Sequence, residues 1–475
     1  MVIEFVWSHL FRSAALDALA LGAANLNSPL KVLMICWAFP PDAQIGALRV
    51  ARFCRYLPEF GVEPIVLTME DRFRETLDNS LAAIDGLRIV RTEVAATPVD
   101  WYRRSKAVLA RPGKAGKELP RAATSSVRKS FLRRQLLSLL QLPGPDAGWY
   151  YPALRAARKL VREQPIAAIF SSSPPTVSHR IALRLRKESN LPWLADFRDP
   201  WTTSSIENDE PAWWRYLSKS MESRCVRSAD RVICNTEWLR KDFLRSNPEL
   251  PQQKFATITN GFDDQTLPLV KPLQAGSRRL FLHLGNIYGL RRIDTFCLAV
   301  ENLVKTQRID PSTFQIVFLG QIEPSLEAAA RTSAPGLFQL GCVEFRARVG
   351  REEAQQTLAR ADMLLIFQGG HYLQIPAKFY DYLLTGRPIL VVAQEGALTS
   401  LLEETGSGIW ADPENPDEIA ASFLRAVALP AISPVEAQQR WHERFHYRVL
   451  TQRLASYIRS VVAGRSSPID GRTLP

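Results

Sequence analysis

Two acids and a cation stand together in one short segment, DFRDPW at residues 196–201. The segment begins inside an apolar run that is typical of a strand, so its polar side chains are expected where that strand ends. A carboxylate in such a place can orient an acceptor hydroxyl or take its proton. The candidates for catalysis are therefore Asp199, Asp196 and Arg198. The structural alternative is an Asp–Arg ion pair that only fixes the loop ahead of Pro200.

Cations also follow the strand predicted at residues 279–285. Gly285, Asn286, Arg291 and Arg292 come at its end or directly after it. Guanidinium groups bind phosphate through a two-pronged fork, and a cation that faces a leaving phosphate stabilises the charge developing there. The alternative is an ordinary pair of surface arginines. The position at a strand end favours the phosphate role.

Lys378 lies at the start of a predicted helix, just after Ile375 and Pro376. Proline suits the first turn of a helix, and helix N-termini attract phosphate. The alternative is a surface charge on that helix. We expect a binding role for this segment.

A glycine and three arginines mark the helix that follows the first strand. Gly46 has no Cβ and would let a ligand approach the backbone closely, although a plain tight turn would also need it. Arg49 stands at the helix start, from where it could reach a phosphate. Arg52 and Arg55 recur at three-residue spacing, and we expect them to form a solvated basic face.

Two series of alternating strands and helices position these residues. Strands of the first series are predicted at 30–37, 64–68, 166–173, 192–197, 231–236 and 255–259. Helices of this series are predicted at 47–60, 176–188 and 212–228. Strands of the second series are predicted at 279–285, 314–320, 336–341, 361–367 and 388–393. The second series also has a helix at 293–307, and a long helical stretch covers 434–462.

This alternation predicts an α/β fold with two doubly wound parallel sheets. Ligands bind such sheets at the carboxyl ends of the strands, where helix N-termini favour phosphate. A pyrophosphate-bearing ligand is therefore expected in the second half. The chain has no GxGxxG after a strand, no GxxxxGK[ST] and no GxSxG. Standard nicotinamide, P-loop and serine-hydrolase sites are thereby disfavoured.

The order of several motifs resembles glycosyltransferase family 4, a branch of the GT-B enzymes. The motifs are FPPDAQIGALR (39–49), SSSPP (171–175), DFRDPW (196–201), ITNGFD (258–263), LGNIYGLR (284–291) and IPAKFYDYLLTGRPIL (375–390). The resemblance covers roughly residues 30–460. It implies GT-B architecture: two Rossmann-like domains facing a cleft, and a C-terminal helix that crosses back. It also implies a nucleotide-sugar donor in the second domain, an acceptor in the first, and metal-independent transfer with retention.

The resemblance assigns roles residue by residue. Relatives place an Arg and a Lys near the donor diphosphate, where this chain has Asn286 and then Arg291 or Arg292. Asp381 matches the second acid of the E-x7-E motif, but the first acid is replaced by Leu373. Sugar contacts are then expected from His371, Tyr372 or the backbone at 369–370. Many relatives have a His in the acceptor loop, where this chain has Arg198–Asp199, so Asp199 is the first candidate base and Asp196 the second.

The resemblance and the composition together give six predicted segments. They are an N-terminal extension (1–29), an acceptor domain (30–266), a Pro/Gly-containing linker (267–279), a nucleotide-sugar domain (280–433), a return helix (434–463) and a tail (464–475). The 475 residues are long enough for two such domains.

Positive charge is concentrated in one part of the predicted acceptor domain. The chain has a formal net charge of +12, and residues 101–162 hold 15 Lys and Arg against Glu118 and Asp146, which is +13. Nucleic acid is one candidate partner, but no nucleic-acid-binding motif accompanies the charge. A surface loop is the plain alternative. The run VRKSFLRRQLLSLLQL (127–142) mixes cations with Leu and Phe, which favours an anionic membrane surface.

The cysteines and the hydropathy indicate a protein of the cytoplasm. The six cysteines form no CxxC pair, and buried reduced thiols are expected, as in a reducing compartment. No apolar run reaches the roughly 18–20 residues that span a bilayer. The expected function is a glycosyltransferase acting on a glycan or lipid-linked acceptor at the inner face of the plasma membrane. The alternatives are an inactive GT-B-like binding protein and a GT-B sugar-nucleotide epimerase.

Overall fold

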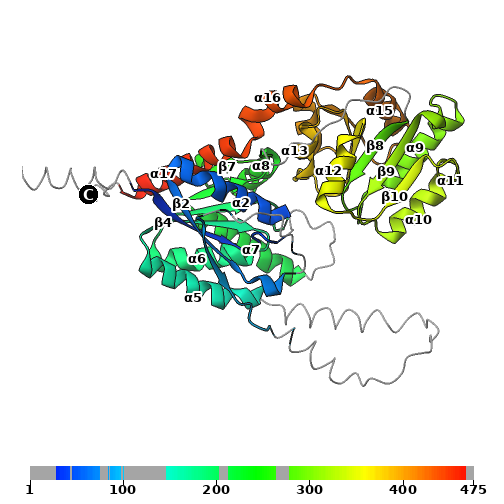
Figure 1. Ribbon diagram of the computed structural model, residues 1–475. Coiled ribbons are helices and arrows are strands. Elements are labelled where there is room, and N and C mark those ends of the chain that lie inside the picture. The colour runs from blue at the N-terminus through cyan, green and yellow to red at the C-terminus, as the bar shows by residue number, and fades with distance from the viewer. Residues whose placement is uncertain are drawn as a thin grey trace, which may run out of the picture.

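The protein was analysed as a computed structural model that describes residues 28–42, 45–74, 77, 84, 86–97, 100, 146–202, 212–263 and 278–466. Two parallel sheets form two separate layered bodies (Figure 1). The first sheet has seven strands in the order β3-β2-β1-β4-β5-β6-β7, and the second has six in the order β10-β9-β8-β11-β12-β13. In both, the chain starts near the middle strand and winds outward in two directions. This is the doubly wound arrangement expected from the sequence.

The first sheet is built from strands whose alternate residues face two different cores. Its strands are β1 (Leu30–Cys36), β2 (Val62–Met69), β3 (Arg88–Thr92), β4 (Ile166–Ser173), β5 (Trp193–Phe197), β6 (Arg231–Cys234) and β7 (Phe255–Thr257). In β1, Leu33 and Ile35 pack toward one core, while Val32 and Met34 pack toward the other. Because successive side chains of a strand point to opposite faces, a continuous apolar run is needed when both faces are covered.

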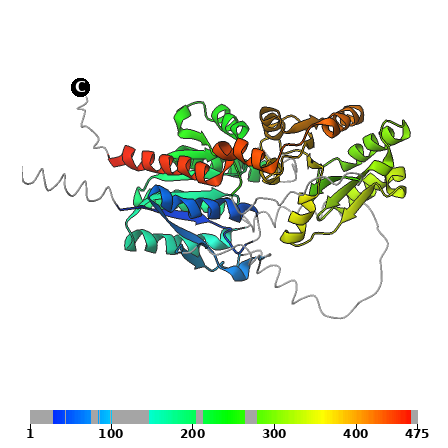
Figure 2. The ribbon, with the colours of Figure 1, turned by 45° about the horizontal axis from the view of Figure 1, so that its top comes forward.

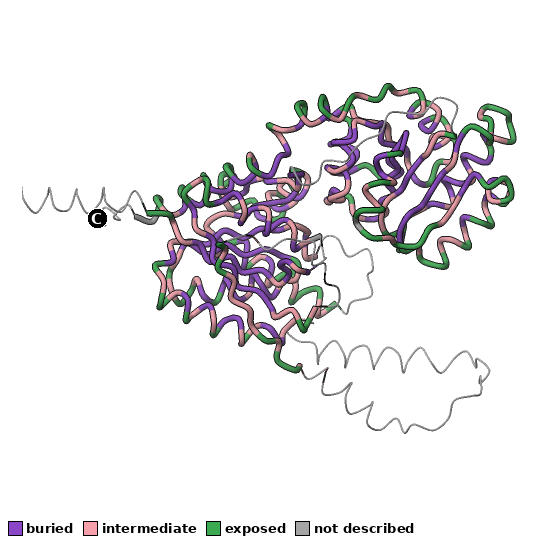
Figure 3. Tube along the Cα trace, viewed as in Figure 1, coloured by how far each residue is buried: buried purple, intermediate pink, exposed green. Residues whose placement is uncertain are grey.

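Helices cover both faces of this sheet. One face carries α5 (Ala147–Glu163), α6 (Val177–Ser189), α7 (Ala212–Ser228) and α8 (Glu237–Ser246). The other carries α2 (Ile45–Tyr56), the short helix η1 (Leu57–Phe60) and α17 (Tyr447–Ser466). In Figure 3 the buried residues concentrate along the strands and on the helix faces turned to them.

The second sheet repeats this plan. Its strands are β8 (Arg279–Leu284), β9 (Phe314–Leu319), β10 (Val343–Arg346), β11 (Met363–Gln368), β12 (Ile389–Ala393) and β13 (Gly408–Ala411). One face packs on α9 (Ile293–Lys305), α10 (Pro324–Ser333), α11 (Pro335–Gln339) and α15 (Pro416–Ala428). The other packs on α12 (Arg351–Ala359), α13 (Lys378–Leu383), α14 (Ala397–Thr405) and α16 (Pro434–Phe445).

Two predicted elements differ from the structure. Residues 336–341 were expected to form a strand, but α11 occupies Pro335–Gln339. Pro335 stands in the first turn of that helix, where proline is favoured. The long helix expected at 434–462 is two helices, because the backbone at His446 is extended (φ −69°, ψ 133°) and ends α16 there.

The break at His446 marks the place where the chain returns to the first body. α16 packs on α13, where the rings of Phe445 and Tyr380 lie 5.3 Å apart. α17 packs on α2, where the rings of Tyr447 and Phe53 lie 5.6 Å apart. Figure 2 shows α17, in red, lying along the first body. The return helix implied by the resemblance is therefore present.

A second crossing lies beside this one. The backbone N–H of Phe262 donates to the carbonyl of Phe445 (3.1 Å), and that of Tyr447 donates to the carbonyl of Phe262 (2.9 Å). Gly261 lies so close to the Phe445 carbonyl that a Cβ there would overlap it. The NGFD motif thus fastens the end of the first series to the junction of α16 and α17.

Several predicted segments lie wholly or mostly outside the described residues: the extension 1–29, the linker 267–279, the tail and most of the basic segment 101–162. The described end of the basic segment belongs to α5, where Arg158 pairs with Glu188 (2.6 Å). In the described part of the chain, no helix is long and apolar enough to cross a bilayer. All six cysteines are buried free thiols, as expected.

Candidate functional site

The carboxyl ends of the two sheets border one cleft of about 810 Å³. The first body contributes residues from the start of α2 and from the loops after β5, β6 and β7. The second contributes the loops after β8, β9, β10 and β11. Predicted site residues that line this cleft are Gly46, Arg49, Arg198, Asp199, Gly285, Asn286, Arg291, His371, Ile375, Pro376 and Lys378. Asp196, Arg292 and Asp381 are not among the lining residues.

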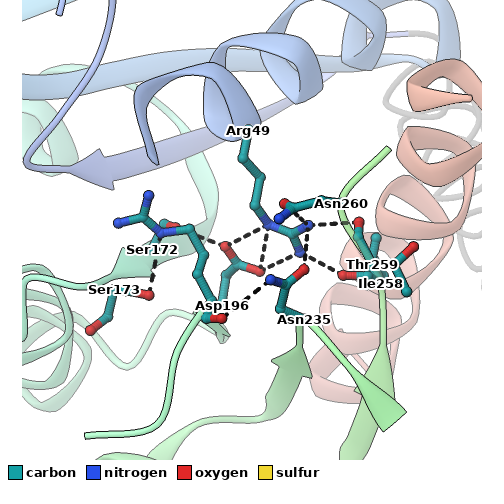
Figure 4. A network of polar contacts seen from close by, with 9 residues as sticks. Arg49, Ser172, Ser173, Asp196, Asn235, Ile258, Thr259 and Asn260 are labelled. Carbon is teal, nitrogen blue, oxygen red and sulfur yellow. Dashed lines mark hydrogen bonds and ion pairs between the residues drawn. The ribbon is translucent and has the colours of Figure 1, made fainter. Parts of the chain in front are cut away.

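Arg49 and Asp196 form a buried ion pair at the floor of the first body (Figure 4). The Nη2 atom of Arg49 lies 2.8 Å from Oδ1 of Asp196, and the two side chains are 2% and 0% exposed. Ser172 donates its hydroxyl to the same carboxylate at 2.7 Å. Burial opposes the charge on Arg49, but the carboxylate outweighs it and raises the pKa of the guanidinium.

The remaining N–H groups of Arg49 are also occupied. They donate to the carbonyls of Ile258 and Thr259 (2.7 Å each) and to the side-chain oxygen of Asn260 (3.3 Å). A guanidinium has five N–H donors, and all of them meet protein acceptors. Arg49 therefore joins α2, β5 and the NGFD segment, and its geometry does not support the expected contact with a phosphate. Asp196 faces Arg49 and does not line the cleft.

Arg198 and Asp199 continue the chain into the cleft. The Arg198 guanidinium donates to the carbonyls of Ser173 and Pro174, and burial lowers its pKa. It lies directly over Gly46, where a Cβ would overlap its nitrogen atoms. Asp199 is half-buried, and burial raises the pKa of its carboxyl. Of the candidate carboxylates, Asp199 is the one that lines the cleft.

Two glycines form the floor of the second body. Gly285 follows β8 with φ +123° and Gly320 follows β9 with φ +154°, both in the region that favours glycine. The N–H of Gly285 donates to the carbonyl of Leu319 at 2.8 Å, and a Cβ on Gly320 would overlap the backbone of Gly285. A Cβ on Gly285 would meet the Nζ of Lys378 at 2.8 Å. The lysine thus lies against the bare backbone at this strand end.

Lys378 is held there by a buried histidine. Its Nζ lies 3.2 Å from Nε2 of His283, and Nδ1 of His283 lies 2.9 Å from the carbonyl oxygen of Leu365. Burial, with a smaller contribution from Arg291, lowers the pKa of Lys378 to about 7. Burial also lowers the pKa of His283 well below its usual value.

The loop after β8 carries the other predicted donor ligands. Arg291 stacks on the ring of Tyr288 at 3.9 Å and donates to the carbonyl of Asn286 at 3.4 Å. The side-chain oxygen of Asn286 accepts from the N–H of Gln321 at 3.2 Å. Arg292 turns away and pairs with Asp294 (3.0 Å) and Glu414 (2.5 Å). Of the two arginines, Arg291 is therefore the one placed at the cleft.

Three other residues named in the sequence analysis lie outside the cleft lining. Asp381 helps to raise the pKa of Arg52, which burial alone would lower, so the acid lies toward the first body. Arg52 is not solvated as expected: its side chain is 13% exposed and pairs with Asp263 at 3.1 Å. Leu373, at the position of the missing first acid, is buried in the core of the first body.

Several residues of the site were missed, among them His283, Gly320, Asn235, Asn260 and Arg348. His283 sits in an apolar strand and gave no motif. Gly320 ends a predicted strand, which is the same signal that identified Gly285. Asn235, Asn260 and Arg348 line the cleft from loops whose ends meet only in the folded chain.

Positive charge dominates the cleft. Arg198 lies near Asp199, whereas Arg291, Arg348 and Lys378 have no carboxylate partner among the residues that the structure describes. Asp199 is the one carboxylate in the described lining. Cations without carboxylate partners, of which Arg291 and Lys378 are half-buried, favour an anionic ligand.

The family model described as Glycosyltransferase Family 4 matches residues 46–266. A curated relative from Pseudomonas aeruginosa, named probable glycosyltransferase WbjE, is 26% identical over 156 residues. That match covers 32% of this chain and 37% of the relative, so it spans well under half of either protein.

Solved structures match the whole fold. The apo form of the lipopolysaccharide outer core galactosyltransferase WaaB aligns with a TM-score of 0.57 and 12% identity, over 91% of this chain and 99% of that one. Anabaena HepE in complex with UDP and glucose aligns with a TM-score of 0.56 and 13% identity, over 91% and 100%. These likenesses confirm the GT-B architecture.

Proposed function

We propose that this chain, a GT-B protein whose residues 46–266 match glycosyltransferase family 4, transfers a sugar from a nucleotide-sugar to an acceptor hydroxyl. The observation that carries the proposal is the set of cations without carboxylate partners at the strand ends of the second body. A nucleotide-sugar brings a diphosphate, which supplies the missing negative charge. Anabaena HepE, with the same fold, has been solved with UDP and glucose.

The donor diphosphate would lie over Gly285 and Gly320. There Lys378 and Arg291 face the leaving phosphate and stabilise its growing charge. The two glycines let the phosphate oxygens approach the backbone. Ile375 and Pro376 line the same wall, and His371 lies where the sugar would project.

The acceptor would enter from the first body, beside Asp199. Its hydroxyl would hydrogen bond to this carboxylate, while Arg198 shapes the pocket wall. We expect transfer with retention and without a metal, in which the leaving phosphate takes the proton of the acceptor. Asp199 then orients the hydroxyl, and no strong base is required.

We further propose that the product belongs to a surface polysaccharide or glycolipid. The names of structural neighbours support this, since WaaB acts in the lipopolysaccharide outer core. A lipid-linked acceptor would be met at the inner face of the membrane, with residues 127–142 on the anionic leaflet. Deleting 127–142 should release the protein from vesicles of anionic lipid while donor binding survives, and unchanged vesicle binding refutes this contact.

The test of transfer begins with a thermal-shift panel of UDP-, GDP- and ADP-sugars. At least one should stabilise the protein, and Lys378→Gln should lose that effect. Lys305→Gln is the matched control, because Lys305 lies on α9 and pairs with Glu301 (2.6 Å) away from the cleft. Turnover is then measured by mass spectrometry with an added lipid extract. No stabilisation by any nucleotide-sugar would overturn the proposal.

A second candidate is a GT-B protein that binds a nucleotide-sugar without transferring it. The observation that favours it is Leu373. This leucine stands where family members have an acid, and it is buried in the core of the first body. Strong nucleotide-sugar binding with neither transfer to any acceptor nor slow hydrolysis of the donor would support this candidate.

A further inference from the structure

Lys378 is a half-buried amine that faces the cleft without a carboxylate partner among the described residues. Its Nζ hydrogen bonds to His283 (3.2 Å), and the described residues offer it no carboxylate. The aliphatic part of the side chain rests against Gly285. An amine in this position must either carry a charge that no protein group balances or give up its proton.

His283 is fixed as a neutral acceptor toward Lys378. It is 0% exposed on β8, and its Nδ1 lies 2.9 Å from the carbonyl oxygen of Leu365. Because a carbonyl only accepts, Nδ1 carries the proton and Nε2 carries the lone pair. Burial and the neighbouring Lys378 both lower the pKa of His283, so the ring stays neutral. The imidazole therefore aims Lys378 and cannot donate to it.

The other groups around Lys378 do not neutralise it. Arg291, from the loop after β8, adds positive charge. Arg348, from the loop after β10, lines the same cleft, as do His371 from the loop after β11 and Asp199 from the first body. On the helix of Lys378 itself, Asp381 interacts with Arg52, and the hydroxyl of Tyr382 accepts from the N–H of Leu284 at 2.9 Å.

We propose that His283 positions Lys378 against the donor diphosphate, and that Lys378 takes up a proton from solvent when the diphosphate binds. The lone pair of Nζ accepts the proton, and the resulting ammonium donates to a phosphate oxygen. The inference rests on the proposed function, because it requires a diphosphate ligand. The low pKa of Lys378, about 7 in the empty cleft, agrees with it.

Calorimetry of donor binding tests the proton uptake. The probe is whichever of UDP-glucose, GDP-glucose and ADP-glucose stabilises the protein most, because the phosphates of these diesters do not titrate between pH 6 and 8.5. Titration in buffers of different ionisation enthalpy gives the number of protons taken up. With a pKa of about 7, uptake should approach about one proton at pH 8 and fall toward zero at pH 6. Strong binding with no uptake at pH 8 overturns the inference and leaves the proposed function intact.

Two variants assign the proton to Lys378. Lys378→Arg keeps the charge at every pH, so its uptake at pH 8 should vanish. Uptake equal to that of the wild type would assign the proton elsewhere and overturn the inference. His283→Leu removes the acceptor that stabilises the ammonium, so the uptake curve should move to lower pH and affinity should fall about tenfold. His179→Leu is the matched control, since His179 is also fully buried but lies in the first body. An unshifted curve in His283→Leu overturns the positioning role.

Unfolding without ligand gives an independent measurement if Lys378→Arg fails to bind. The folded pKa of Lys378 lies below the usual lysine value, so the unfolded chain binds more protons between about pH 7 and 10. Wild-type stability is therefore lowered most at and below pH 7. Lys378→Gln should be more stable than the wild type there, and the difference should shrink as the pH rises toward 10. A difference that does not change with pH overturns the inference.

Discussion

The ion pair of Arg49 and Asp196 joins parts of the chain that are 147 residues apart. Arg49→Met would leave the Asp196 carboxylate buried without a cation, which typically destabilises a protein by about 3–5 kcal/mol. We expect a loss of that size in urea unfolding. The control is Arg55→Met on the same helix, because Arg55 is 29% exposed and lies 3.7 Å from Asp263. It should cost about 1 kcal/mol or less. Equal losses for the two variants would contradict this prediction.

A substitution at Gly46 should lower the activity of the protein and leave its stability nearly unchanged. In Gly46→Ala the new methyl group displaces the Arg198 guanidinium, whose contacts shape the acceptor side. We expect kcat/KM to fall at least tenfold, while the free energy of unfolding changes by no more than about 1 kcal/mol, since alanine favours helix. Gly464→Ala, on α17 with no neighbour near the added atom, should leave both unchanged. Full activity in Gly46→Ala would show that Arg198 has no role at the cleft.

We expect the activity of the protein to fall at acidic pH because of Asp199. Burial raises the pKa of its carboxyl, so the ionised form is lost at a higher pH than for an ordinary aspartate. Activity should therefore fall as the pH drops through this raised pKa, and Asp199→Asn should lower kcat and abolish this fall. Burial also raises the pKa of Glu222, which binds the backbone of Trp201 away from the cleft. Glu222→Gln should keep the fall at acidic pH, and losing it would assign the titration to Glu222.

The candidate site was partly predictable from sequence at this scale. Gly46, Asp199 and Gly285 were found because strand ends in parallel sheets collect ligand-binding residues, and Lys378 was found because it lies at the start of a helix. The sequence did not predict that Asp196 pairs with Arg49 while Asp199 lines the cleft, because this difference depends on Arg49, which is remote in sequence. His283 gave no signal, since a histidine within an apolar strand is usually an ordinary core residue.

At the scale of elements, the start of α8 holds the two bodies together on one side of the cleft. The hydroxyl of Thr236 donates to the carbonyl of Leu373 (2.6 Å) and accepts from the N–H of Leu239 (3.0 Å). The indole of Trp238 donates to Ser400 at 3.1 Å. These contacts fix the loop that carries His371.

Thr236→Val should open this contact. The variant loses the helix cap and the bond between the bodies, so we expect about 1–2 kcal/mol of destabilisation and a larger radius of gyration in X-ray scattering. KM for the donor should rise. Thr236→Ser keeps the hydroxyl and should resemble the wild type. An unchanged radius in Thr236→Val would show that the other contacts suffice.

The strands that the sequence missed share a physical property. β3, β10 and β13 are edge strands, and their residues are mostly half-buried or exposed. Central strands are covered on both faces and carry continuous apolar runs, which are easy to recognise. An edge strand has fewer neighbours and tolerates polar residues. The sequence therefore predicted the central strands and the edge strand β7, whose first two residues are buried, and missed the other three edge strands.

At the scale of the whole molecule, the first body depends on the last helix. Tyr447, Leu450, Leu454 and Ile458 of α17 are buried against α2 and the sheet. Deleting residues 447–475 would expose that apolar face. We expect the shortened protein to aggregate or to lose its cooperative thermal transition. Deleting only 467–475, past the end of α17, should leave the melting temperature unchanged. A normal transition without α17 would contradict the prediction.

The side-by-side crossings at Phe262 and His446 have a consequence for synthesis. A chain emerging from the ribosome usually completes its domains in order, the N-terminal one first. Here the first body lacks one layer of its core until residue 466 has been made, although its last strand ends at Thr257. While the roughly 200 residues in between are translated, the apolar surface of α2 and of the sheet that α17 covers stays exposed. The second body, started later, has all its strands and helices by Phe445 and is the first to be finished.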